Sequence, residues 1–168
     1  MTHHNIRTSR HGAAARPRLP EAVAAFVTIL WLGLVLGVSF IATPVKFQAP
    51  SLSLPVALEI GRATFALFSK IELGMAMLLT LSILACNRRA LSTILGAALI
   101  TIVVVETVWL LPVLDERVEI ILSGTAAPAG WYHFFYVGIE TLKAVLLVAL
   151  SAHLLRQLTA TNAETRSE

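Results

Sequence analysis

Four long apolar stretches occupy most of this chain, and three of them contain a glutamate. The stretches cover residues 22–42, 56–85, 91–111 and 131–155, and the glutamates are Glu72, Glu106 and Glu140. About 20 apolar residues in a helix match the roughly 30 Å hydrocarbon core of a bilayer. A carboxylate at that depth is costly unless a partner, a proton or a cation compensates its charge. The pattern therefore predicts a membrane protein with a buried polar site.

The composition agrees with this interpretation. Of the 168 residues, 57% are hydrophobic and only 14% are charged, which is more apolar surface than a soluble domain of this size can bury. Helices are expected because a spanning segment must satisfy its own backbone hydrogen bonds. The sequence thus predicts an all-α membrane protein, built as an antiparallel four-helix transmembrane bundle. The basic residues are dispersed rather than gathered in one patch, so nucleic acid is not an expected partner.

The boundaries follow from the polar segments and prolines. Residues 1–20 and 158–168 are expected to be disordered tails, and residues 21–157 form the four-span domain. Thr43-Pro44 and Pro112 are expected to end the first and third spans, because proline lacks a backbone donor. A short surface helix is expected over residues 115–119.

The distribution of lysine and arginine predicts the orientation. Eight of the 13 basic residues fall on the side of the two tails, whereas only Lys46 and Arg117 fall in the loops of the other side. The positive-inside rule then places both termini in the cytoplasm. Trp109, Trp131 and Tyr132 are expected at the outer interface, as in an aromatic belt. The expected location is the plasma membrane of a bacterium. In bacteria that have two membranes, this is the inner membrane.

The last span has a polar stripe. At about 100° per residue, four of its polar side chains share one face of the helix; they are His133, Tyr136, Glu140 and Lys143. Counting along the helices also places all three glutamates in one layer of the outer half of the membrane. Lys70 and Lys143 would neutralise part of the acidic charge. The predicted buried polar site therefore combines the stripe with Glu72, Glu106 and Lys70.

Several roles for this site remain open from the sequence. Glu140 and Lys143 could form only an internal ion pair, the whole set could be a structural network, or the carboxylates could serve a proton relay or transport path. A divalent metal ion is the weaker alternative, with Glu72, Glu106, His133 and Glu140 as ligands, because the Glu-x-x-His spacing of di-iron bundles is absent. No cofactor is predicted, and no catalytic residue can be assigned.

Gly33 and Gly37 form a Gly-x-x-x-Gly pattern in the first span. Small residues at this spacing allow two helices to approach closely. Packing inside the bundle is the favoured interpretation, and dimerisation is the alternative.

Three segments resemble a known family. Glu106-Thr-Val-Trp109-Leu-Leu-Pro112 and Trp131-Tyr132-His133 are similar to segments of the transmembrane protein 205-like family, as is the Gly-rich first span leading to Thr43-Pro44. The resemblance covers roughly residues 22–155 and implies a four-helix membrane fold with no established reaction. Members of that family tend to have asparagine in the places of Glu106 and Glu140.

The expected function is that of a small transporter-like or ligand-binding membrane protein. Two alternatives are a non-catalytic membrane subunit and a membrane enzyme that uses an outward-facing His133 with Glu140. The enzyme is the less favoured of these. The lipid bilayer is the expected surrounding, and a second copy of the chain or another membrane subunit remains open as a partner.

Overall fold

The structure is a computed structural model that describes residues 19–86, 90–125 and 130–164, the last four without their side chains. The described residues form four long helical rods and contain no strand. The first rod joins α1 (Leu19–Val35), η1 (Leu36–Ala42) and α2 (Thr43–Lys46), and the second is α3 (Leu54–Ala85). The third joins α4 (Ala90–Val105), η2 (Glu106–Leu110) and α5 (Leu111–Leu122), and the fourth is α6 (Tyr132–Glu164).

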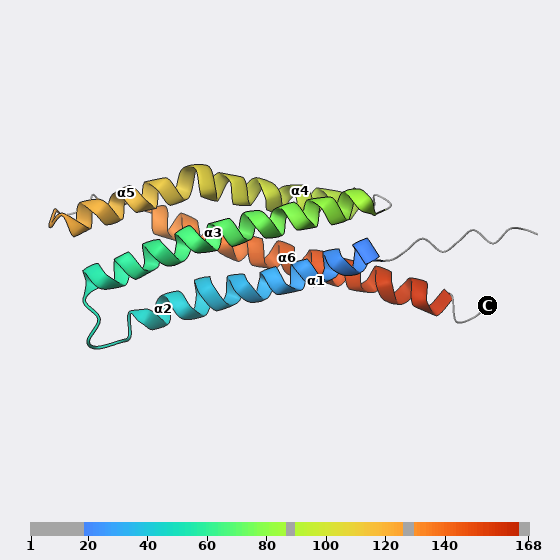
Figure 1. The fold of residues 1–168 in the computed structure, drawn as a ribbon, viewed down its shortest axis with the longest axis horizontal. Coiled ribbons are helices and arrows are strands. Elements are labelled where there is room, and N and C mark those ends of the chain that lie inside the picture. Colours follow the sequence, from blue (N-terminus) through green and yellow to red (C-terminus); the bar gives the residue numbers. More distant parts are fainter. Residues whose placement is uncertain (1–18, 87–89, 126–129, 165–168) are drawn as a thin grey trace, which may run out of the picture.

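Successive rods run in opposite directions (Figure 1). We call the end of the bundle with Leu19, Ala85 and Glu164 the terminal end, and the end with Lys46 and Leu122 the distal end. α1 packs against α3 and α6, and α4 packs against the same two helices, so the four rods form a ring. Each rod is long and apolar enough to cross a membrane. The chain is therefore an all-α four-helix membrane bundle, as the sequence predicts.

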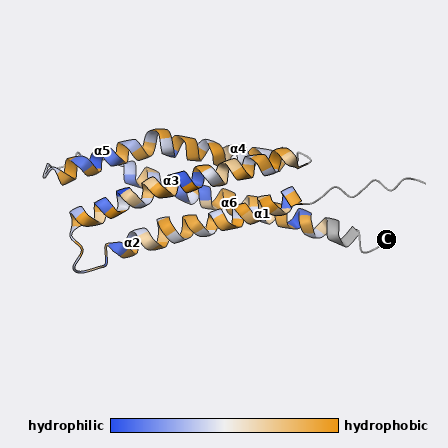
Figure 2. Ribbon diagram, viewed as in Figure 1, coloured by the Kyte–Doolittle hydropathy of each residue, from blue (hydrophilic) through white to orange (hydrophobic). Residues whose placement is uncertain are grey.

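The interior and the exterior of the bundle are both apolar. Fully buried side chains include Trp31, Leu79, Leu99 and Leu147, which pack together between the rods. Large hydrophobic side chains are also exposed along every rod, and hydrophobic residues cover most of the length of the ribbon (Figure 2). A soluble protein of this size does not expose so much continuous apolar surface. Lipid is the medium that suits this exterior.

The two prolines do not end their helices, which corrects the sequence prediction. The first rod continues through Pro44 to Lys46, and the third continues through Pro112 to Leu122. Residues 115–119 therefore belong to this long rod rather than to a separate surface helix. In each rod a π-helical segment precedes the proline: the Thr43 N–H bonds to Val38 O, and the Leu111 N–H bonds to Glu106 O. This wider turn adjusts the hydrogen bonding before a residue that has no donor.

The polar C-terminal segment also differs from the expected tail. α6 extends to Glu164, so residues 158–164 are helical rather than disordered. Leu19 and Pro20 are likewise helical. The rest of the two predicted tails, residues 1–18 and 165–168, lies outside the described residues.

The glycine pattern of the first span does not bring two helices of the bundle together. A Cβ atom built on Gly33 or Gly37 would meet no neighbouring atom within 4 Å, so packing inside the bundle is the wrong interpretation of this pair. The close approaches between helices occur at two other glycines. Gly61 lies against the end of the Lys46 side chain, and Gly96 lies against Ile83 where α4 packs on α3.

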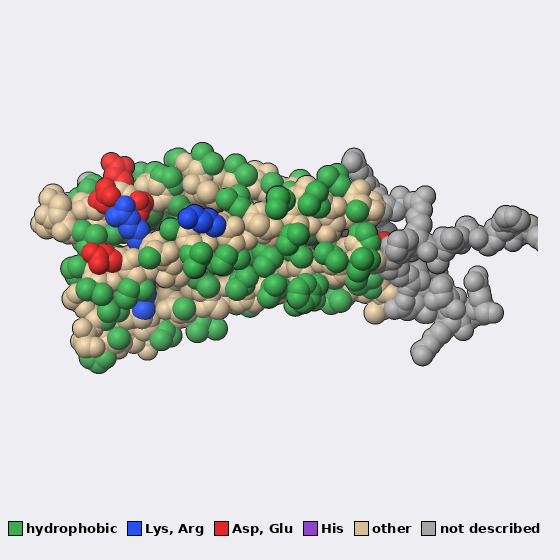
Figure 3. Space-filling view, viewed as in Figure 1, with side chains coloured by type: hydrophobic (Ala, Val, Ile, Leu, Met, Phe, Trp, Pro, Cys, Tyr) green, Lys and Arg blue, Asp and Glu red, His purple; other side chains and the backbone are tan. Residues whose placement is uncertain are grey.

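An exposed group of charges joins α3 to α5 at the distal end. The Arg62 guanidinium lies 2.5 Å from Asp115 Oδ1 and 2.7 Å from Glu119 Oε1. Acidic and basic side chains gather at this end of the molecule, at the left of Figure 3. Exposed ion pairs of this kind stabilise a fold only slightly. These charges nevertheless make the distal end polar, in contrast to the apolar middle of the bundle.

Candidate functional site

The side chain of Lys143 ends among three carboxylates inside the bundle. Its ammonium lies 2.8 Å from Glu72 Oε1 and 2.6 Å from Glu140 Oε1, and it also forms an ion pair with Glu106 Oε2. All four residues are buried, with Lys143 at 0% exposure. An ammonium has three N–H donors, so three carboxylates match its capacity. We call these four residues the Lys143 cluster.

Three of the four rods supply charges to this cluster. Glu72 comes from α3, Glu106 from the first residue of η2, and Glu140 with Lys143 from α6. The i,i+3 spacing of the last two places both side chains on one face of α6. One oxygen from each glutamate lies within 4.8 Å of the others, so the carboxylates converge on a single point.

The first rod supplies two uncharged donors. The fully buried Trp31 on α1 donates from Nε1 to Glu72 Oε1 at 2.9 Å, and Ser39 in η1 donates to Glu140 Oε2 at 2.6 Å. Hydrogen bonds to a carboxylate favour its charged form. All four rods therefore contribute polar groups to the site.

Tyr136 lies on the distal side of the cluster. Its side chain is buried, packs edge-on against Phe65 with the ring centroids 5.1 Å apart, and interacts with the Ser39 hydroxyl. Lys46 lies next to this group, with Nζ 5.9 Å from the Phe65 ring centroid. These side chains close the cluster toward the distal end.

Glu106 has the fewest hydrogen-bond partners of the three glutamates. It is 2% exposed, and its Oε2 faces Lys143, but its Oε1 has no hydrogen-bond partner among the described residues. A buried carboxylate oxygen without a partner is costly. The three glutamates, which look equivalent in the sequence, are therefore chemically different in the fold.

The cluster contains more acid than base. With every group ionised, three carboxylates and one ammonium give a net charge of −2. An uncompensated charge of this size is strongly unfavourable away from water. Protons or a further cation are therefore needed to bring the site close to neutrality, and binding such a species is the chemistry that the arrangement allows.

Both π-helical segments meet the cluster. η1 contains Ser39, and η2 begins at Glu106. π turns inside α-helices occur frequently at functional sites, and they rotate the residues beyond them relative to a regular helix. Here each π segment presents a polar side chain of its rod to the same interior point.

Two residues of the predicted site lie away from it. Lys70 is exposed on α3, and no ion pair involving it is found in the described part of the chain. His133 is exposed near the start of α6, where its ring lies 6.5 Å from that of Phe134. His133 is therefore not placed with the glutamates as a metal ligand, and the Lys143 ammonium lies among the three carboxylates that remain.

Sequence reasoning missed Trp31 and Ser39. A signal for Trp31 was available, because a buried indole usually needs an acceptor for its N–H. The signal for Ser39 was weaker: it lies one helical turn before Pro44, where the helix needs an adjusted hydrogen-bond pattern. Neither residue could be assigned to a particular glutamate without the fold.

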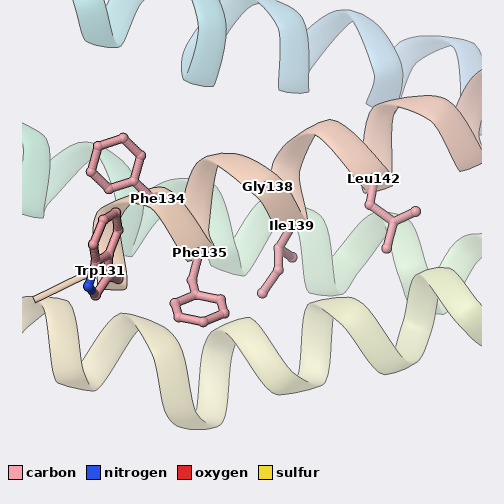
Figure 4. Close-up of a pocket in the computed structure, with 6 residues that line it drawn as sticks. All are labelled: Trp131, Phe134, Phe135, Gly138, Ile139 and Leu142. Atoms are coloured by element: carbon pink, nitrogen blue, oxygen red, sulfur yellow. The ribbon is translucent and has the colours of Figure 1, made fainter.

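A separate apolar hollow of about 490 Å³ lies beside the distal half of α6. Figure 4 shows its six lining residues, which are Trp131, Phe134, Phe135, Gly138, Ile139 and Leu142. None of them belongs to the Lys143 cluster or is charged. The hollow suits an apolar occupant and is chemically distinct from the polar site.

The chain matches no protein-family model, and neither the curated proteins nor the solved structures contain a significant match to it. The geometry of the Lys143 cluster is therefore the basis for assigning a function.

Proposed function

We propose that this chain is a small transporter-like or ligand-binding membrane protein whose binding site is the Lys143 cluster. The observation on which the proposal depends is a buried ammonium held by three carboxylates, which leaves an excess of negative charge in the middle of a membrane bundle. That excess selects positively charged species. The ligand class is therefore a proton, a metal ion or a small organic cation.

A purely structural role explains the cluster less well. A lysine that had only to be neutralised would need a single carboxylate, as in an ordinary ion pair. Two further buried acids add a desolvation cost that packing with apolar residues would avoid. Ionisable residues within membrane spans commonly mark binding sites and ion pathways.

We infer from the basic residues that the terminal end faces the cytoplasm. Residues 88 and 89 and the N-terminal arginines would then follow the positive-inside rule. Glu72 lies about 20 Å along α3 from Ala85, so in this orientation the cluster would lie in the outer half of a core of about 30 Å. We propose the bacterial inner membrane as the location, and we retain the similarity to the transmembrane protein 205-like family as a proposal supported by four spanning helices.

A ligand screen on the purified protein tests the proposal. Thermal unfolding would be measured in detergent with alkali cations, divalent cations, small organic amines and a series of pH values. We expect at least one class, or acidification, to raise the melting temperature of the wild type. Glu106→Gln should reduce that response, because it removes one negative charge from the cluster. Glu59→Gln, at an exposed position of α3, is the matched control and should respond as the wild type does.

Two results would contradict the proposal. One is a wild type whose stability responds to no cation and to no change of pH. The other is a Glu106→Gln variant that responds to every condition as the wild type does.

One observation favours a second candidate, a non-catalytic membrane subunit. Lys70 presents a charged side chain on the exterior of a spanning helix. Charged groups on a lipid-facing surface are unfavourable, and an acidic group of a neighbouring membrane protein would compensate it. This candidate predicts that Lys70→Met loses a membrane protein that co-purifies with the wild type. No contact in the described structure joins His133 to Glu140, so we do not propose the enzyme.

A further inference from the structure

The three glutamates of the Lys143 cluster have unequal support, and this inequality suggests which one binds the ligand. We propose that Glu106 is the exchangeable proton-binding residue of the cluster, while Glu72 and Glu140 keep their hydrogen bonds to Lys143, Trp31 and Ser39. The inference rests on the proposed function and names its ligand as a proton. The step is a simple proton transfer: an O–H bond of a hydronium ion breaks, an O–H bond forms on the Glu106 carboxylate, and a water molecule is left.

Glu72 and Glu140 each accept hydrogen bonds from neighbouring side chains. Glu72 Oε1 accepts from Trp31 Nε1 at 2.9 Å and from Lys143 Nζ at 2.8 Å. Glu140 accepts on both oxygens, from Lys143 on Oε1 and from Ser39 on Oε2, each at 2.6 Å. Hydrogen bonds of this kind stabilise a carboxylate relative to its protonated form. Protonation of either residue would weaken contacts that the fold has already built.

Glu106 has no such support. Only its Oε2 faces Lys143, in an ion pair, and neither of its buried oxygens has a hydrogen-bond partner among the described residues. Its Oε1 is therefore an acceptor that is open to a proton. Adding a proton at Glu106 changes the net charge from −2 to −1 and leaves the Trp31 and Ser39 hydrogen bonds in place. The cluster can thus take up and release one proton with little rearrangement.

The surroundings of Glu106 contain few other groups that titrate. α3 contributes Glu72, and α6 contributes Tyr136, Glu140 and Lys143. From the first rod, the cluster receives only the neutral donors Trp31 and Ser39. Two carboxylates and one ammonium thus leave a net charge of −1 around Glu106. This residual charge attracts a proton to it.

A metal ion is the competing occupant, because one oxygen from each glutamate lies within 4.8 Å of the others. The Lys143 ammonium, however, already binds all three carboxylates. A metal ion would have to displace this ammonium and leave it buried without partners, which is strongly unfavourable. A proton adds at Glu106 without displacing any group, and it is therefore the favoured occupant.

Infrared difference spectroscopy on the protein in lipid nanodiscs tests the assignment. Spectra taken at neutral and alkaline pH, where exposed carboxyl groups stay ionised, would show the carbonyl stretch of a buried carboxyl group that is protonated. In the wild type we expect one such band, which shifts in D₂O and disappears at alkaline pH. The whole band should be lost in Glu106→Gln and kept in Glu59→Gln. Circular dichroism would verify that Glu106→Gln is folded.

Glu106→Asp covers the case in which the glutamine variant does not fold. It keeps an acid at this position but shortens the side chain, so its band should appear at a different frequency from that of the wild type. A band at the wild-type frequency in Glu106→Asp, or one that persists in a folded Glu106→Gln, would assign the proton to another residue. The Lys143 cluster would then remain the binding site and only the assignment would be wrong.

A different result would distinguish the metal ion from the proton. A wild type with no protonated carboxyl band but with a large stabilisation by a metal ion overturns the proton assignment and keeps the proposed function. A wild type with neither the band nor any response to cations overturns both.

Discussion

At the scale of single residues, Lys143 is the central residue of the polar interior, because it pairs with all three buried carboxylates. Its ammonium is the only positive charge in contact with Glu72, Glu106 and Glu140 among the described residues. Removing one partner from a buried charge network leaves the others uncompensated, at a cost of about 3–5 kcal/mol. The role of the lysine can therefore be tested separately from that of any ligand.

We predict that Lys143→Met strongly destabilises the protein at neutral pH. The loss should be about 3–5 kcal/mol, because three buried carboxylates then face one another without a cation. Thermal or denaturant unfolding in detergent measures it. Lys70→Met is the matched control, since Lys70 is an exposed lysine of a spanning helix, and it should change stability by about 1 kcal/mol or less. Equal effects of the two substitutions would show that the ion pairs of Lys143 contribute little.

Spacing along the chain indicated some of these residues and not others. The i,i+3 pair Glu140–Lys143 could be predicted because one helix determines both positions. The common depth of the three glutamates followed from the helical rise. The wider stripe failed at His133, which shares the helix face but lies exposed near the helix start. Helical phase gives the direction of a side chain but not which neighbour lies opposite it.

At the scale of elements, the rods tolerate prolines because π turns precede them. Pro44 and Pro112 lie inside long helices rather than at their ends. The same turns contain Ser39 and Glu106, so the backbone irregularity and the site coincide. The sequence predicted a helix end at each proline, because the missing N–H donor can be read from the residue type alone. The continuation of each rod depends on packing against its neighbours.

Helix packing gives a second prediction, which concerns Gly33 and Gly96. A Cβ on Gly96 would lie too close to Ile83 Cδ1, whereas one on Gly33 would meet nothing within 4 Å. Gly96→Ala should therefore be less stable than Gly33→Ala by about 1–3 kcal/mol, the usual cost of overpacking. Both substitutions remove a helix glycine, so the comparison cancels the difference in helix propensity. Chemical denaturation of the two variants in the same detergent provides the measurement, and a more stable Gly96→Ala would refute the packing argument.

The contact between α3 and α5 gives a third prediction. Arg62 pairs with Asp115 and Glu119 at exposed positions. Arg62→Gln should cost about 0.2–1 kcal/mol, and the loss should shrink as salt is added, because exposed ion pairs are screened. Unfolding at low and high ionic strength checks this. The Lys143→Met loss should depend much less on salt, since those charges are buried.

At the scale of the whole molecule, the proposed orientation can be tested with the single cysteine. Cys86 lies at the terminal end, immediately after α3. Partial burial, and to a smaller extent the Glu21 carboxylate, raise the pKa of its thiol, so the reactive thiolate is scarcer at neutral pH. Labelling with a membrane-impermeant maleimide should therefore be carried out at mildly alkaline pH.

We predict that Cys86 is labelled only after the cells are opened. A Cys86→Ser, Ser123→Cys double variant moves the thiol to the distal end, and it should be labelled on intact cells, because the positive-inside rule places that end outside. For bacteria with an outer membrane, spheroplasts replace intact cells. The opposite pattern would invert the orientation and place the Lys143 cluster in the inner half of the membrane.

The sequence by itself determined the membrane class, the number of spans and the common depth of the glutamates. These properties depend on segment length, apolar composition and helical rise, all of which are local quantities. Only the tertiary structure decided that Glu72, Glu106 and Glu140 share Lys143, that Trp31 and Ser39 support two of them, and that Glu106 is left with a free oxygen. Those contacts join different rods, and the rotation of each rod about its axis is determined by packing against the other rods.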